Sequence, residues 1–208
     1  MLTFALLAPV SLVTLPFAAL LVAARPGAPL QWLAAGLAAC LSAGLLVAPE
    51  SGLLDGLIRA WIVLVSVALA AQAALRRGEA GFWSLALRAC LYAAAGVVVL
   101  GRAVAGAAVW SAVQWDATRA ASGAMRGVVE FVPAAYPAFE PAVRILAAGW
   151  PVWLLLATLA GLALAWQGHA LVARTPLGPP LVAPRARPDQ VPRPDAHAPA
   201  RGGVVLNH

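Results

Sequence analysis

Long hydrophobic runs that carry almost no charge alternate along this chain with short segments rich in arginine, proline and glycine. A helix needs about 20 predominantly apolar residues to cross the roughly 30 Å hydrocarbon core of a bilayer. Five runs meet this requirement: residues 2–24, 30–48, 57–75, 82–101 and 145–166. The pattern therefore predicts an all-α, polytopic integral membrane protein with about five transmembrane helices, with four or six as the alternatives.

The first run could be a retained helix or a cleaved secretory signal peptide. It has no basic residues before its apolar part, and it is longer than the usual signal-peptide core of about 7–15 residues. We therefore expect a retained helix. Pro9 and Pro16 should kink or break it unless neighbouring groups satisfy the carbonyls that the prolines free.

Residues 103–132 have a different pattern, with charged side chains near one face of a helix and alanine and valine over much of the rest. This is typical of a long amphipathic helix, which either continues the fourth span or lies in the lipid headgroups. The proline-rich segment 132–142 should end it, because each proline disfavours helix at the residue before it.

Two smaller patterns inside the spans predict contacts. Gly36, Cys40 and Gly44 repeat every four residues and form a small-residue face on which another helix can pack. Asp55 and Arg59 also lie four residues apart, so they can form an ion pair where the third span meets the interface.

The composition of the 208 residues agrees with a membrane location. Hydrophobic residues make up 62% and charged residues 11%, against about 45–50% and 25% in soluble proteins. These values exclude a soluble enzyme, a disordered regulator and a secreted disulfide scaffold. The net charge of +6 comes from arginines scattered between apolar runs, so we expect the lipid bilayer as partner and no nucleic acid.

The arginines also predict the orientation of the chain. The first loop, the third loop and the C-terminal segment carry eight arginines, and the opposite side carries four, Arg59, Arg119, Arg126 and Arg144. The positive-inside rule then places the N-terminus outside and the C-terminus in the cytoplasm of an inner membrane. Residues 1–174 form the predicted transmembrane domain, and 175–208, rich in proline and arginine, form a predicted disordered cytoplasmic tail.

Candidate chemistry is sparse. We find no nucleophile elbow, phosphate-binding loop, zinc-binding histidine pair or dinucleotide loop, so we expect no catalysis, no cofactor and no metal site. Arg88 lies about two turns into the fourth span, where an arginine usually faces protein or water. Arg88 and Arg102 are therefore the candidate ligand-binding residues, with snorkelling to the headgroups or a structural ion pair as the alternative.

Residues 136–180 carry a resemblance to a known family. A proline-started apolar helix ends in Trp166, a basic residue follows at Arg174, and then comes a Leu-Gly-Pro-Pro turn within 176–180. This pattern resembles the YybS-like family of uncharacterised bacterial membrane proteins, with Asp189-Gln190-Val191 as the remnant of a later family segment. That family continues with further helices, so this chain is expected to be either a truncated or frameshifted member or a different protein with a similar helix.

The family is similar to the substrate-binding S components of energy-coupling-factor transporters. The resemblance therefore implies a transporter-like component that binds a small molecule within a helical bundle. The alternative is a non-catalytic membrane scaffold or assembly subunit of a larger complex, with a membrane protein partner or a second copy. The small-residue faces and the lack of polar pore residues favour that alternative.

Overall fold

The computed structural model describes residues 2–47, 52–75, 81–173, 177 and 181 of the chain. Within this part the regular secondary structure is helical, as the sequence predicts, and contains no strand. The α-helices are α1 (Leu2–Ala23), α2 (Pro29–Val47), α3 (Leu53–Leu75), α4 (Phe82–Ala105), α5 (Val109–Phe131) and α6 (Phe139–Val172). Two 3-10 segments flank α5: η1 (Gly106–Ala108) and η2 (Pro133–Ala138).

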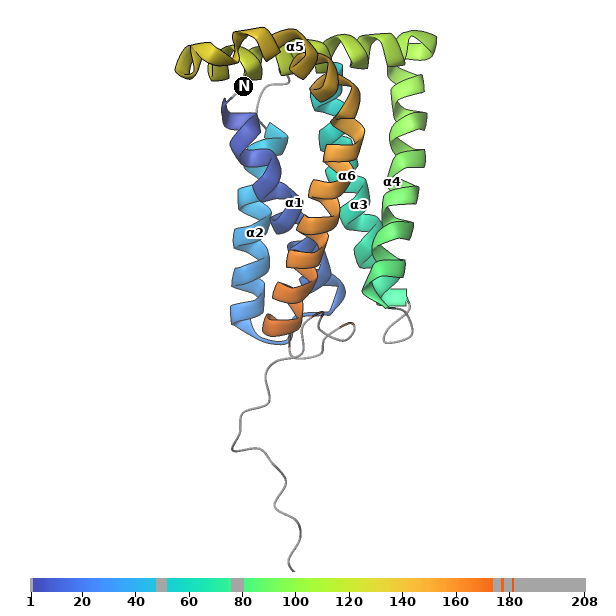
Figure 1. Cartoon of the computed structure of the whole chain (residues 1–208). Coiled ribbons are helices and arrows are strands. Elements are labelled where there is room, and N and C mark those ends of the chain that lie inside the picture. Colours follow the sequence, from blue (N-terminus) through green and yellow to red (C-terminus); the bar gives the residue numbers. More distant parts are fainter. Residues whose placement is uncertain (1, 48–51, 76–80, 174–176, 178–180, 182–208) are drawn as a thin grey trace, which may run out of the picture.

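Five helices stand side by side as a bundle, and α5 lies across one end of it (Figure 1). In the bundle, α1 packs against α2, α3 and α6, and α3 packs against α4. The first turns of α6 pack along α5. The helix then turns and descends through the bundle (Figure 1), and Pro151 lies inside it.

Three helical stretches of the described residues are long and apolar enough to cross a membrane: Leu53–Leu75, Phe82–Phe131 and Phe139–Val172. Val10–Ala23 is a shorter apolar helix. These lengths and compositions suggest a membrane location. They contain three of the five predicted spans, the runs 57–75, 82–101 and 145–166, whereas the runs 2–24 and 30–48 are not among these stretches.

The second of these stretches changes direction at Gly106. This glycine has a φ of +59°, a conformation in which a side chain is strained. Its N–H bonds to the carbonyl of Arg102 and ends α4. The sequence left two alternatives for residues 103–132, and the structure has the second geometry: α5 turns across the bundle instead of prolonging α4 (Figure 1).

α1 remains one helix through both of its prolines. Pro16 has no N–H, so the carbonyl four residues earlier, that of Leu12, loses its donor within the helix. That carbonyl faces α6 at Gly161, where a Cβ atom would lie only 2.6 Å from the Leu12 oxygen. The missing side chain of Gly161 therefore lets α6 approach the backbone of α1 at the site that Pro16 opens.

The largest cluster of buried side chains lies where α1, α3, α4 and α6 meet. Trp166 of α6 is 1% exposed, and its ring centroid is 5.5 Å from that of Phe82 at the start of α4. The predicted tail falls outside the described residues except at Leu177 and Leu181. Leu177 is buried in this cluster and Leu181 packs against it, so the described part of the tail contacts the bundle.

Among the described residues nothing packs against the small-residue face of α2. Gly36, Cys40 and Gly44 are exposed, and a Cβ at either glycine would meet nothing within 4 Å. α2 instead buries Ala35 and Ala38. The buried side of α2 also carries Ser42, which bonds to Thr14 of α1, and packing of a further helix on Gly36, Cys40 and Gly44 stays a prediction.

Candidate functional site

A pocket of about 190 Å³ lies at the end of the bundle opposite α5. Its walls come from the end of α1, the turn that follows, the start of α2 and the end of α6. The lining residues are Leu21, Ala24, Arg25, Pro26, Gly27, Gln31 and Ala173. Drug-sized ligands usually occupy about 300–1,000 Å³, so this pocket is smaller than a typical site for such a ligand.

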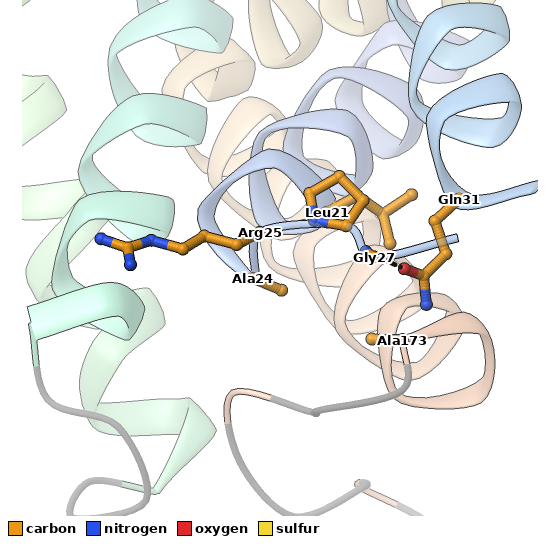
Figure 2. Close-up of a pocket in the computed structure, with 7 residues that line it drawn as sticks. Leu21, Ala24, Arg25, Gly27, Gln31 and Ala173 are labelled. Atoms are coloured by element: carbon orange, nitrogen blue, oxygen red, sulfur yellow. Dashed lines mark hydrogen bonds between the residues drawn. The ribbon is translucent and has the colours of Figure 1, made fainter. Parts of the chain in front are cut away.

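Gln31 is the central polar side chain of this pocket and is only 5% exposed. Its Oε1 accepts the N–H of Gly27 at 3.0 Å, and its Nε2 donates to the carbonyl of Val172 at 3.1 Å. Figure 2 shows Gln31 reaching toward Gly27 and Ala173, whereas the side chain of Arg25 extends away from them. Because both the oxygen and the nitrogen of the amide bond to the protein, its main effect is to join three parts: α2, the turn between α1 and α2, and the last turn of α6.

A group of charged residues lies at the other end of the bundle, where α3 begins beneath α5. The Arg59 Nη2 and the Asp55 Oδ2 are 2.9 Å apart, and both side chains are almost fully buried. Nε of Arg59 also donates to Oδ1 of Asp55 at 3.1 Å. The predicted pair is thus present in a bidentate geometry, which fixes both side chains. Breaking a buried pair leaves an uncompensated charge, so we assign it a structural role.

Asp116 of α5 extends this group by capping α3. Its Oδ2 accepts the N–H of Leu54 at 3.1 Å, which is one of the donors left unpaired at a helix N-terminus. A Cβ at Gly52 would lie 2.5 Å from that same oxygen. The glycine therefore leaves the space that the carboxylate occupies, and the contact fixes α5 to the bundle.

The two candidate ligand-binding arginines do not share a site. Arg88 and Arg102 are both exposed on α4, and fourteen residues of helix place them about 21 Å apart along the axis. Neither lines the described pocket. Ligand binding by either residue remains a prediction.

Polar side chains inside the bundle mostly bond to a backbone carbonyl, and two pairs of side chains also bond across helices. Nε1 of Trp61 in α3 donates to Oγ1 of Thr158 in α6 at 2.9 Å. The hydroxyls of Thr14 and Ser42 join α1 to α2 at 2.7 Å. In an apolar surrounding such bonds hold helices together, each worth about 0.6–1.7 kcal/mol.

His169 is the exception in the described part of α6. It is 1% exposed, and its Nε2 has no hydrogen-bond partner among the described residues. Its ring lies 6.3 Å from that of Trp166. Across the described ranges no group of three His, Cys, Asp or Glu side chains could hold a metal ion.

The sequence patterns did not reveal three of these contact residues. Gln31 could have been noticed as the one amide in an otherwise apolar span. Thr158 and Asp116 gave no such signal, because their partners Trp61 and Leu54 are 97 and 62 residues away. Only the packed helices show which polar groups meet.

The fold and the contacts described above define a helical protein with stretches that can cross a membrane. Comparison with known proteins found no family model, no curated protein and no solved structure that matches the chain. Its function must therefore be inferred from its own residues.

Proposed function

We propose that this chain is a non-catalytic membrane scaffold, an assembly subunit of a larger complex in the bacterial inner membrane. In this proposal α1, α2, α3, α4 and the descending part of α6 cross the bilayer as five spans. α5 lies at the outer surface, and the N-terminus faces outside. The end of the bundle that carries Arg25 faces the cytoplasm, in agreement with the positive-inside rule.

The observation that carries the proposal is the exposed position of Arg88 on α4. α4 packs mainly against α3, and its outer side carries large exposed apolar residues, among them Leu87 at 52%, Leu91 at 69% and Tyr92 at 63%. An arginine surrounded by such residues raises the free energy of inserting the helix into a membrane, by about 2.5–3.5 kcal/mol at a helix centre. The cost is lower where a group outside the helix satisfies the charge. A carboxylate on a neighbouring membrane helix would satisfy it, as would lipid headgroups within snorkelling reach.

A transporter-like component that binds a small molecule is the second candidate. It is favoured by the pocket around Gln31 and by the resemblance of residues 136–191 to the YybS-like family. In that case the ligand would have to be small, because the pocket holds about 190 Å³. An arginine that bound it would be expected at a cavity inside the bundle, and Arg88 is exposed on α4 instead.

Native mass spectrometry in a mild detergent distinguishes the two candidates. The wild-type chain should appear in an assembly larger than one copy, and Arg88→Gln should reduce that assembly at least tenfold. Arg102→Gln is the matched control, since it removes another exposed arginine of α4 and should leave the assembly intact. A monomeric wild type, or an assembly that survives Arg88→Gln, would contradict the scaffold proposal and favour the second candidate.

A further inference from the structure

α5 and residues 139–149 of α6 form a helical hairpin across the end of the bundle, which we call the platform. Its two arms pack through a small apolar cluster in which Ala121, Val143 and Ala147 are buried, with Met125 and Phe139 against them. Figure 1 shows that the far end of the platform reaches past the bundle on the side of α1 and α2. We call the end of the platform that includes η2, residues 122–146, the tip.

The apolar face of α5 continues from the bundle out to the tip. Val113 is 1% exposed and packs with Leu57 and Val109 against the bundle. Phe131 follows Val113 by eighteen residues, which is about five full helical turns, so both point to the same side. Phe131 is nevertheless 88% exposed, and Val128, about 60° around the helix, is 46% exposed. The face that the bundle covers at Val113 is therefore uncovered at the tip.

The opposite side of α5 carries charged residues and also Trp115, which is 70% exposed. Arg119, Arg126 and Glu130 lie roughly 100–140° around the helix from Val113, and all three are exposed. An apolar stripe with a charged opposite face is the pattern of a helix that lies in the plane of a membrane interface.

We propose that the tip is an in-plane membrane anchor whose covering partner is the bilayer that surrounds the bundle. This inference rests on the proposed function, in which the descending helices cross the bilayer; α5 lies across them at their ends (Figure 1) and so runs parallel to the membrane surface. Its apolar face thus points toward the acyl chains beside the bundle, at the depth where interfacial helices settle, about 5–10 Å into the boundary. Val128 and Phe131 insert there, and Arg119 and Arg126 stay among the headgroups.

The charges on α5 give this anchor little selectivity between anionic and neutral phospholipids. Two arginines and Glu130 leave a net charge of about +1 on the outer side of α5, and one basic residue near an anionic surface adds about 1 kcal/mol. The partner is therefore a phospholipid surface in general, with only a small preference for anionic headgroups.

Spin labels on the full chain in phospholipid nanodiscs test the anchor. In a Cys40→Ala, Cys90→Ala background, nitroxides at positions 128 and 131 should collide often with oxygen, which partitions into lipid, and rarely with a water-soluble nickel chelate. Labels at 119 and 126, on the opposite side, are the matched controls and should show the reverse. Two positions on each side keep the test decisive if one variant fails to fold.

Either of two results would overturn the anchor. Equal access of the nickel chelate to positions 131 and 126 would mean that the tip stands in water. Poor access of both reagents to 128 and 131 would mean that protein, such as a second copy or a partner, covers the face. The outcome does not depend on whether Arg88 mediates assembly, so the two proposals can fail separately.

Discussion

Gly161 of α6 lies against the carbonyl of Leu12, which Pro16 leaves without a donor inside α1. The sequence predicts that the carbonyl freed by Pro16 needs a neighbour, but it cannot say which residue supplies it. That neighbour is almost 150 positions away in the chain, and a glycine there looks like any other small residue of an apolar run. The contact becomes visible only when α1 and α6 are packed.

Gly161→Ala should destabilise the bundle by about 1–3 kcal/mol, because the new methyl group would lie 2.6 Å from the Leu12 oxygen. Gly36→Ala is the control: it adds the same methyl group to a helix where nothing lies within 4 Å, and it should be neutral or stabilising. Thermal unfolding in detergent measures both. Equal unfolding midpoints for the two variants would contradict the close approach of α1 and α6.

At the level of helices, the hydropathy pattern predicted well where the helices lie along the sequence. It predicted poorly which side of each helix is packed and in which direction it runs. The run 82–101 corresponds to α4 and 145–166 to most of α6, because apolar length alone identifies a span. The faces of α2 show the limit of this reasoning: Gly36 and Ala35 are both small, so spacing cannot decide which one is packed. The choice depends on Thr14 of α1, whose hydroxyl meets Ser42. The direction of α5 depends on one glycine, Gly106. It lies in a stretch that the hydropathy pattern alone could not divide into two helices.

Asp116→Ala should weaken the junction between α5 and α3. Loss of a side-chain cap typically costs about 0.5–2 kcal/mol, and here it would leave the N–H of Leu54 without that acceptor. We expect faster hydrogen exchange in the first turn of α3, with little change near Leu75. Gln114→Ala, an exposed change on the same helix, should leave exchange unaltered; an identical pattern in both variants would show that the cap contributes nothing.

For the molecule as a whole, the arginine distribution and the bundle geometry together predict which positions lie on which side of the membrane. α1 ends and α4 begins at the end of the bundle opposite α5 (Figure 1). Positions 27 and 81 should therefore share one side of the membrane, and position 130 should lie on the other. The sequence predicts which side is which, through the positive-inside rule, but not the exposed or buried position of each charge.

Single cysteines at positions 27, 81 and 130, in a background without Cys40 and Cys90, measure this arrangement in intact cells. A membrane-impermeant maleimide should label position 130 directly and positions 27 and 81 only after permeabilisation. A fully inverted pattern would reject the orientation and keep the fold. Labelling of all three positions from one side would reject the proposed spans.

The bond between Gln31 and Val172 spans 141 residues and has a consequence for the order in which the protein is built. α1 and α2 can pair as soon as the ribosome has released them, since their contacts are local. The bond of the Gln31 amide can form only once the last turn of α6 has emerged, after α3, α4 and α5. Long-range contacts of this kind form late, so closure of this end of the bundle should be a late step in folding. A nascent chain halted before Val172 should contain α1 and α2 already paired in the membrane. The amide of Gln31 should then still lack its bond to the last turn of α6.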